Sequence, residues 1–512
     1  MIRRTRRDQE IFENLAVPEA ANNPKGDPER GKKIVNGYRR FVRYNWVMAA
    51  AIWARVLLLA AQCERTMMLG LILIFSMVSL VVCFIINQYF SVTSVDAISS
   101  LVWVPKDCFP NWGLRVGRHC FNDYAEFTVV GVLPNPWDPY KNTYPAGALL
   151  PLMTFAGPAA WLHTPMAGLF AYLLALTIAV LIPAVWAAWG ARGLERVVVF
   201  LALGAVAVPA WMAIDRGNSV GFIAPIGLVF LVALRRQRWG LVAAVVIVGA
   251  LVKPQFAVLA AVFFAVRQWR MGGVAVSGIV LSNLAAYLLW PRDFPGTIVT
   301  TIHNLHQYGS SSPALTGINN LSFASGVLLI PDHIMRMKMS FVPPEFLAGP
   351  RSVIGNVVLV VVVLGALLLG RRIPPVMAGV ALLAGAALFP AVAGRYYLVF
   401  ALAVAALIVR DPEGAPGVGI FDHLGHLGDR RRWVGVWLSL ACAVSIAQIA
   451  LPGGPGETQG ATPIVATTAI VAPILWLVAC GAILLSYARR PAGHVDAQSL
   501  PSSAPSGTRV GV

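Results

Sequence analysis

The sequence LVAAVVIVGALVKPQFAVLAAVFF, residues 241–264, is apolar except around Lys253 and Pro254. A run of about 17–25 apolar residues is long enough to cross a bilayer as a helix. Ionisable groups at membrane depth are costly and are usually retained for a purpose. The stretch therefore predicts a membrane protein with two short apolar helices, 240–252 and 255–267, and a functional cation at the turn between them.

The composition extends this prediction to the whole chain. Of 512 residues, 57% are hydrophobic and 12% are charged, against about 25% charged in a soluble domain. We therefore expect an all-α polytopic membrane protein, because the alternating short strands of a membrane β-barrel are not seen. The net charge of +17 lies in Arg clusters between apolar blocks, which the positive-inside rule explains without a nucleic-acid partner.

Counting charges orients the spans. The segment Ala148–Leu162 is short and contains Pro151 and Pro158. If it crossed the membrane, nearly every later basic cluster would be translocated, so we expect it not to cross. Both termini are then cytoplasmic. About twelve spans follow from this map, at residues 67–90, 166–189, 197–213, 220–234, 240–252, 255–267, 273–290, 353–369, 374–391, 396–409, 433–451 and 464–487.

The same map divides the chain into a core and two tails. Residues 1–66 are expected to form a cytoplasmic tail, in which Trp46–Ala61 is either an interfacial helix or a cytoplasmic lead-in. Residues 67–490 form the transmembrane domain, with outer loops at 91–147 and 291–352. The Ser-, Pro- and Gly-rich segment 491–512 is expected to be a disordered cytoplasmic tail.

Unusual polar residues collect on the outer side of this map. The first outer loop combines carboxylates with many aromatic residues, as a sugar-handling site requires, and it includes Asp107, Asp123 and Asp138. Arg216, Lys253 and Arg395 each lie beside an apolar block on the same side. Arg binds phosphate with paired donors and Lys binds it as a point charge, so these three cations predict a site for an anionic headgroup.

The order of these features resembles glycosyltransferase family 87, a branch of the GT-C membrane glycosyltransferases. The resemblance rests on an acidic residue after the first span, two Pro/Tyr pairs, an Arg-Gly-Asn, a Lys-Pro and an Asn-x-Ser. It covers roughly residues 67–410 and is carried by NDYAEF with Asp123, Pro139-Tyr140, Tyr144-Pro145, DRGNS at 215–219, ALVKPQ at 250–255 and NNLSF at 319–323. Tyr396 and Tyr397 stand where family members have paired His, which leaves the sugar and the acceptor open.

The resemblance implies a GT-C-like bundle with its active site on the outer face of a bacterial plasma membrane. It implies a polyprenyl-phosphate sugar as donor, mannose or arabinofuranose as the sugar, a glycolipid or polysaccharide as acceptor, and no cofactor. Asp123 is then the expected base, with Asp107 or Asp96 as alternatives, and the three cations bind the donor phosphate. Expected substrate-binding residues are Asp138, Tyr140, Asn218, Asn319, Asn320, Tyr396 and Tyr397.

Each assignment has a simpler structural alternative. Asp123, Asn319 and Asn320 could cap loop helices, and Asp138 lies in a turn-forming sequence. The sole role of Arg216 could be an ion pair with Asp215. Lys253 could extend to the membrane surface, and Arg395 could anchor the helix at the interface. His303, His306 and His333 share one loop without the spacing of a metal site, so we expect no metal.

Two further expectations concern the outer loop and the class of protein. Cys108 and Cys120 share the first outer loop, where a disulfide between them is chemically allowed and expected. The alternative class is a polytopic transporter or lipid flippase, which would show two related halves with broken helices. The two halves of this chain look unlike, which favours the transferase.

Overall fold

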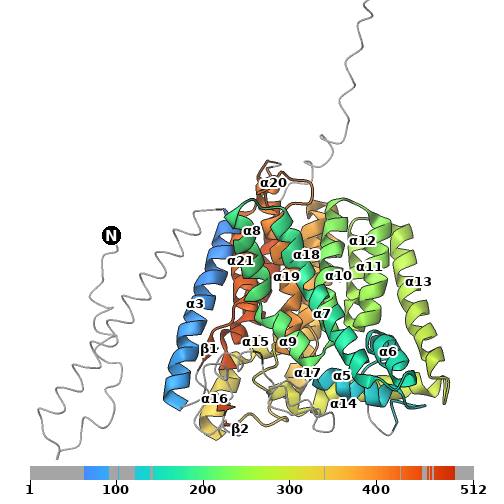
Figure 1. Ribbon diagram of the computed structural model, residues 1–512. Coiled ribbons are helices and arrows are strands. Elements are labelled where there is room, and N and C mark those ends of the chain that lie inside the picture. Colours follow the sequence, from blue (N-terminus) through green and yellow to red (C-terminus); the bar gives the residue numbers. More distant parts are fainter. Residues whose placement is uncertain are drawn as a thin grey trace, which may run out of the picture. The chain divides into compact units, whose positions relative to one another are not determined.

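The computed structural model describes residues 63–90, 102, 121–138, 142–339, 341–426, 428–451, 458–459, 462–463 and 466–489. Between residues 63 and 489 the described chain is a bundle of helices that run side by side between two ends (Figure 1). The predictions for the first 62 residues and for the tail 491–512 lie outside the described residues.

Five helical segments in the described chain are long and apolar enough to cross a membrane, namely Glu64–Ile85, Pro165–Trp189, Trp269–Leu289, Ala348–Arg372 and Thr468–Ala488. They comprise α3 (Glu64–Phe90), α7 (Pro165–Trp189), α13 (Trp269–Ala286) with η6 (Tyr287–Leu289), α17 (Ala348–Leu369) with η8 (Gly370–Arg372), and η10 (Thr468–Val471) with α22 (Ala472–Ala488). A sixth is added if the pair Leu194–Ala205 and Val208–Arg216, bent by 43°, forms one span. This pair comprises α8 (Leu194–Phe200), the π-helix η3 (Leu201–Ala205) and α9 (Val208–Arg216).

Shorter apolar helices of 10–17 residues fill the rest of the bundle. They are α6 (Ala146–Trp161), η4 (Ser219–Phe222) with α10 (Ile223–Arg235), α11 (Trp239–Val252), η5 (Pro254–Ala260) with α12 (Ala261–Ala265), α18 (Pro375–Leu388), η9 (Arg395–Val399) with α19 (Phe400–Val409), and α21 (Arg432–Ile446). The helical class is confirmed, and the five or six longer segments of the described chain could span a membrane. The number of twelve spans is not confirmed, because these shorter helices do not reach the length of a crossing.

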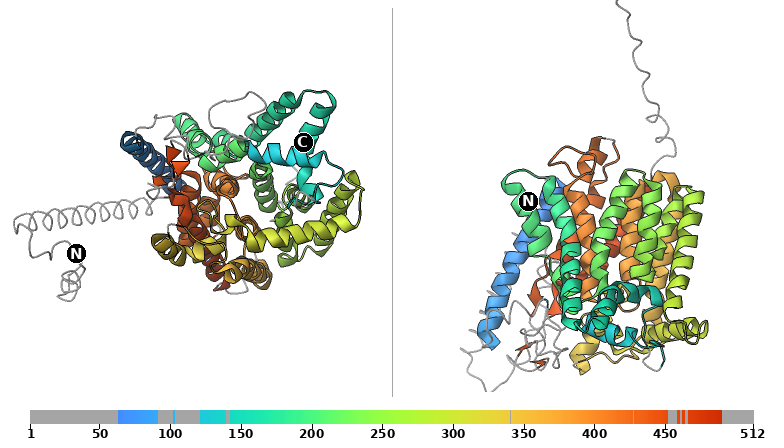
Figure 2. Two further views of the ribbon diagram at one scale, coloured as in Figure 1. Left: turned by 90° about the horizontal axis from the view of Figure 1, so that it is seen from below. Right: turned by 45° about the vertical axis from the view of Figure 1, so that its right-hand side comes forward.

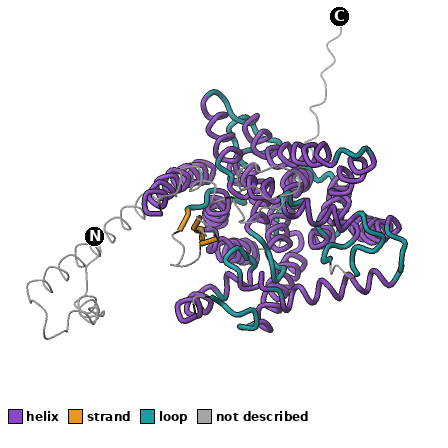
Figure 3. The backbone as a smooth tube through the Cα atoms, turned by 60° about the horizontal axis from the view of Figure 1, so that its bottom comes forward, coloured by secondary structure: helices purple, strands orange, loops and turns teal. Residues whose placement is uncertain are grey.

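Two pairs of very short strands depart from the all-helical prediction (Figure 3). They are β1 (Ala450–Leu451) with β4 (Ala466–Thr467), and β2 (Thr458–Gln459) with β3 (Thr462–Pro463), both antiparallel. The predicted spans 433–451 and 464–487 are therefore too long at the ends that face each other. The buried Thr467 hydroxyl donates to the Gln448 side chain over 3.1 Å, and this bond holds the two extended segments together.

One end of the bundle gathers basic residues from distant parts of the sequence. The Arg430 guanidinium donates two hydrogen bonds, of 3.0 and 2.7 Å, to the Glu64 carboxylate, and Arg235 lies 3.3 Å from Asp411. We call this the Arg-rich end, defined by Arg65, Arg235, Arg410 and Arg430; it includes α20 (Ile420–His426), at the top of Figure 1. The charge count assigns these four arginines to the same side of the membrane, and they lie at the same end of the bundle.

The opposite end holds the short helices of the two predicted outer loops. These are α5 (Asn122–Gly131), α14 (Gly296–Ser311), η7 (Pro313–Thr316), α15 (Phe323–Val327) and α16 (Leu329–Met339). Figures 1 and 2 show α5, α6 and α14 together at this end. We call it the Asp123 end, after the buried carboxylate of α5.

Helix α6 begins and finishes at the Asp123 end. It follows Tyr144, which contacts Lys253, and it turns into α7 so that Gly168 lies against both Ala159 and Tyr124. A Cβ on Gly168 would lie 2.6 Å from the Cβ of Ala159 and 3.2 Å from the hydroxyl of Tyr124. The segment therefore begins and finishes at one end of the bundle, and its non-crossing position in the membrane stays a prediction.

The packing of α17 on α18 allows a test of stability. A Cβ on Gly355 would overlap the backbone carbonyl of Phe389, whereas a Cβ on Gly349, in the same helix, would meet no atom within 4 Å. We expect Gly355→Ala to destabilise the protein by about 1–3 kcal/mol. Gly349→Ala should be neutral or slightly stabilising. Thermal unfolding of the two variants in detergent checks this, and equal unfolding temperatures would contradict the packing.

Candidate active site

A glycine at the end of α9 brings α5 against the bundle. Gly217 adopts the left-handed conformation, with φ of 62°, and a Cβ there would lie 2.8 Å from the Cβ of Tyr124. The N–H of Phe121 donates to the carbonyl of Asp215 over 2.7 Å, and the Tyr172 hydroxyl donates to the Gly217 carbonyl over 2.9 Å. The sequence Arg216-Gly217-Asn218 thus turns sharply around the first residues of α5.

This turn places two side chains on the carboxylate of Asp123, which is only 6% exposed. Arg216 donates from Nη2 to Oδ1 over 2.7 Å and from Nε to Oδ2 over 3.3 Å, and Asn218 Nδ2 also donates to Oδ2. The backbone N–H of Val220 donates to Asn218 Oδ1 over 2.9 Å, which turns the Asn218 amino group toward the carboxylate. Asp123 is therefore held in one orientation by directed, charge-assisted hydrogen bonds.

A tyrosine connects this carboxylate cluster to the predicted lysine. Lys253 is 3% exposed and lies in the break between α11 and η5. Its ammonium donates to the Tyr144 hydroxyl over 2.6 Å and lies 3.9 Å from the centre of the Tyr144 ring. The same hydroxyl accepts from Asn218 Nδ2 over 3.2 Å, and the ring stacks on Phe127 with centroids 3.9 Å apart.

Tyr144 was not among the predicted site residues. The Tyr144-Pro145 pair was noticed only as part of the family resemblance, because an aromatic residue at the end of an apolar block is common in membrane proteins. Its proximity to Lys253, which lies 109 positions later in the chain, could not be seen from local sequence.

Burial changes the ionisation of the Lys253–Tyr144 pair. Burial lowers the pKa of Lys253 from 10.5 to about 7; nearby Asp123 opposes this change and Arg216 adds to it. Burial, together with the charge of Asp123, raises the pKa of Tyr144 well above 10. Near neutral pH the phenol therefore keeps its proton, and the lysine is poised between its charged and neutral forms.

Two half-buried tyrosines at the start of η9 face the cations. The Arg216 guanidinium lies 5.4 Å from the ring centre of Tyr396, and the Lys253 ammonium lies 5.9 Å from that of Tyr397. Aromatic faces at these distances favour a nearby cation. The structure therefore brings Asp123, Asn218 and both tyrosines together with Arg216 and Lys253, as the sequence predicted for one site.

Arg395 is buried separately. It is 3% exposed, and its Nε and Nη1 have no hydrogen-bond partner in the described part of the chain. No ion pair or hydrogen bond joins it to the Asp123 cluster among the described residues, although the next two residues in sequence contact that cluster. The predicted group of three cations is thus seen as a pair plus one isolated guanidinium.

Other predicted residues have different surroundings. All four hydrogen-bonding positions of the Asn320 side chain are used by the backbone of Leu315, Ala391, Ser322 and Ala393. This favours the structural alternative for Asn320, which braces the second outer loop. Asn319 is exposed, and Asp138 is exposed in a turn where its N–H donates to Asn135. Asp96, Asp107, Cys108, Cys120 and Tyr140 lie outside the described residues.

The second outer loop contains a buried ion pair that the sequence analysis missed. The Arg351 guanidinium, 1% exposed, contacts the carboxylate of Asp332, which is 8% exposed. Arg351 also donates to the carbonyl of Phe346 over 3.1 Å. His303, His306 and His333 are all exposed in this loop. Across the described residues there is no group of three or more His, Cys, Asp or Glu side chains close enough to hold a metal.

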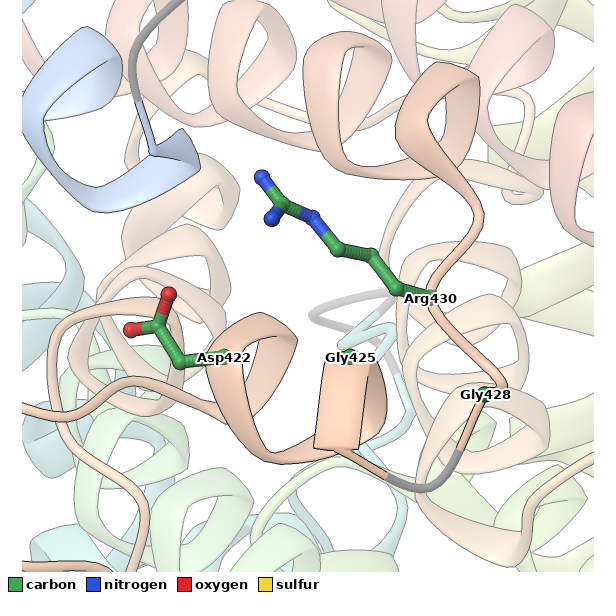
Figure 4. Close-up of a pocket in the computed structure, with 4 residues that line it drawn as sticks. All are labelled: Asp422, Gly425, Gly428 and Arg430. Atoms are coloured by element: carbon green, nitrogen blue, oxygen red, sulfur yellow. The ribbon is translucent and has the colours of Figure 1, made fainter.

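A separate cavity of about 490 Å³ lies at the Arg-rich end (Figure 4). It is lined by Asp422, Gly425, Gly428 and Arg430. Arg430 already pairs with Glu64, and the half-buried Asp422 carboxylate accepts from the N–H of Gly419 over 2.9 Å.

No protein-family model, curated protein or solved structure matches this chain. The functional assignment therefore depends on the chemistry of the residues described above.

Proposed function

We propose that this protein is an integral-membrane glycosyltransferase with a GT-C-like bundle of about twelve spans. It transfers a mannosyl or arabinofuranosyl unit from a polyprenyl-phosphate sugar to a cell-envelope glycolipid or polysaccharide. The reaction takes place on the outer face of a bacterial plasma membrane, and both termini are cytoplasmic. The family resemblance supplies the donor class, and the buried charges at the Asp123 end supply the physical support.

The supporting observation is that two buried cations have no carboxylate partner among the described residues. Lys253 and Arg395 are each 3% exposed, and no described carboxylate lies within 4.0 Å of either. The one acidic group of the cluster, Asp123, is already paired with Arg216. A buried charge without a partner costs several kcal/mol. An anionic ligand would remove this cost, and a phosphate suits both a lysine and an arginine.

The arrangement is suited to an inverting transfer. The Asp123 carboxylate accepts the proton of an acceptor hydroxyl while that oxygen attacks the anomeric carbon of the donor sugar. The bond between this carbon and the phosphate oxygen breaks on the opposite side, and the phosphate leaves with the bonding electrons. Lys253 stabilises the charge that develops on the phosphate. Arg395 is included in the proposal as a second cation, which the bound phosphate would contact from outside the Asp123 cluster. Arg216 and Asn218 keep the base in position.

Transfer from radiolabelled donors tests this proposal. Membranes containing the wild-type protein, and matched membranes without it, are supplied with polyprenyl-phosphate mannose or polyprenyl-phosphate arabinose and authentic acceptor lipids. We expect labelled product with inverted anomeric configuration and one released polyprenyl phosphate per transferred sugar. Absence of product from both donors would refute the transferase proposal, and lipid movement across reconstituted vesicles would then be evidence for the flippase alternative.

The ionisation of Lys253 predicts how donor binding depends on pH. The pKa of about 7 means that Lys253 is charged below this pH and neutral above it. Asp123 and Arg216 face the lysine, and Arg216 stays charged throughout. The donor is a phosphodiester whose own charge does not change in this range. We therefore expect the donor KM to rise by about tenfold as pH increases from roughly 6 to 8.

Lys253→Arg is the matched control for this pH profile, because arginine remains charged. Its donor KM should be nearly flat over the same range. A wild-type KM that is independent of pH, or an identical slope in Lys253→Arg, would show that Lys253 does not bind the donor phosphate.

A further inference from the structure

The hydroxyl of Tyr144 receives two hydrogen bonds from groups that can only donate. Asn218 approaches it through Nδ2, over 3.2 Å, and Lys253 approaches it through its ammonium, over 2.6 Å. The Asn218 amide cannot turn its oxygen to Tyr144 without losing the bond from Val220. When Lys253 is charged, as it is when it binds an anion, its ammonium has three N–H donors and no acceptor. Both lone pairs of the phenol oxygen are therefore occupied by donors.

When Lys253 is charged, the proton of the same hydroxyl has no acceptor among the described residues. A phenol has one O–H donor in addition to its acceptor positions. The hydrogen bonds of Tyr144 in the described residues are those from Asn218 and Lys253 and two within its own turn, where its N–H and carbonyl meet Asn142 and Trp137. The Tyr144 side chain is half-buried rather than enclosed by the protein. The site is thus arranged so that a ligand oxygen can accept this proton.

The position of Lys253 identifies the kind of oxygen. Its ammonium lies 2.6 Å from the phenol oxygen, so an anion that binds Lys253 is also within reach of the Tyr144 hydroxyl. No hydrogen bond joins the Tyr144 hydroxyl to the Asp123 carboxylate among the described residues, and that carboxylate receives Arg216 and Asn218. A phosphate oxygen beside Lys253 is therefore the acceptor that completes the hydrogen bonds of this cluster.

We infer that Tyr144 is a catalytic residue that donates its O–H to a non-bridging oxygen of the donor phosphate. This inference rests on the proposed function and adds a third contact to the phosphate. As the bond between the sugar and the phosphate breaks, negative charge grows on the phosphate and the hydrogen bond from Tyr144 strengthens. The proton stays on Tyr144, so the phenol acts as a fixed donor that stabilises the leaving group, in the manner of an oxyanion hole.

The test removes the hydroxyl and keeps the ring. Tyr144→Phe preserves the stacking on Phe127 and the aromatic face toward Lys253. We expect kcat for sugar transfer to fall by about 10²–10³-fold, as for the loss of one oxyanion-hole donor. The matched control is Tyr487→Phe, which removes a buried phenol at the Arg-rich end, where the hydroxyl donates to the backbone carbonyl of Asp429 over 3.4 Å. Its activity should be unchanged.

A binding measurement separates this inference from the proposed function. The affinities of purified protein for polyprenyl phosphate and for the neutral polyprenol are compared. Tyr144→Phe should lower the preference for the phosphate by about tenfold or more, the value of one hydrogen bond to a charged group. Phe127→Leu, which removes the stacking partner and keeps the hydroxyl, should retain the preference even if the protein becomes less stable.

The outcomes are distinct. Equal loss of affinity for phosphate and alcohol in Tyr144→Phe, or an equal loss of preference in Phe127→Leu, would show that Tyr144 acts only through packing and would overturn the inference. If the wild type prefers the phosphate through Tyr144 but transfers no sugar, the phosphate contact is supported and the transferase proposal fails. A wild type without any preference for the phosphate would refute the inference directly.

Discussion

Asp123→Asn is expected to lower the rate of sugar transfer by about 10²–10⁴-fold, the usual contribution of a general base. The amide that replaces the carboxylate cannot accept the proton of the acceptor hydroxyl. The substitution also leaves the Arg216 guanidinium without its carboxylate, which both Nη2 and Nε now contact. We therefore expect a loss of stability as well, and transfer must be measured per folded molecule.

The structure provides a matched control for this loss of stability. Asp332 forms a second buried ion pair with an arginine, Arg351, at the same end of the bundle. Asp332→Asn should destabilise the protein to a similar extent, and its rate of transfer per folded molecule should stay near that of the wild type. If Asp123→Asn kept full activity, the base would lie elsewhere, and Asp107 and Asp138 would be the next carboxylates to replace.

Arg395→Met is expected to abolish most donor binding and at the same time to stabilise the protein without ligand. Its guanidinium is 3% exposed, and two of its nitrogens lack partners in the described chain. Replacing a poorly compensated buried charge by an apolar side chain of similar length is often stabilising, by about 1–4 kcal/mol. If the guanidinium binds the donor phosphate, affinity for the donor should fall by about tenfold or more.

Arg351→Met is the comparison, and it is expected to lower the stability of the ligand-free protein. Arg351 pairs with Asp332, so its removal leaves a buried carboxylate alone and should cost about 3–5 kcal/mol. Thermal unfolding of both variants, with and without polyprenyl phosphate, measures the contrast. A decrease in stability for Arg395→Met as large as that for Arg351→Met would assign Arg395 a structural role.

Several contacts of the candidate site could be expected from the sequence, because the residues carry ionisable side chains that are costly to bury in an apolar segment. Arg216 and Lys253 stand out as cations beside apolar blocks, and the orientation of the spans placed them on one side. The structure joins them through Asp123, Asn218 and Tyr144. The charge count predicts that α6 does not cross the membrane. The structure adds that α6 begins and finishes at the Asp123 end, and its position in the membrane stays a prediction.

Other features could not be predicted, because they depend on how distant segments pack. Asn320 looked like a substrate-binding residue in an outer loop, but the backbone of Ala391 and Ala393 uses its amide. Asp332 and Arg351 are 19 positions apart in a loop whose fold has no clear sequence signal, so their pairing was missed. The isolation of Arg395 follows from the path of its side chain, which local sequence does not determine.

The contacts between Glu64, at the start of α3, and the late part of the chain have a consequence for biosynthesis. Glu64 pairs with Arg430, a partner 366 residues later, and Ser79 of the same helix bonds to the backbone of Gln448, 369 residues later. At translation rates of about 5–20 residues per second, roughly 20 to 70 seconds separate the emergence of these partners from the ribosome. During this interval the first long helix lacks its final neighbours. Its early insertion into the membrane would then require either a temporary partner from the cell's insertion machinery or lipid alone, and deletions in the last third of the chain should expose it to membrane proteases.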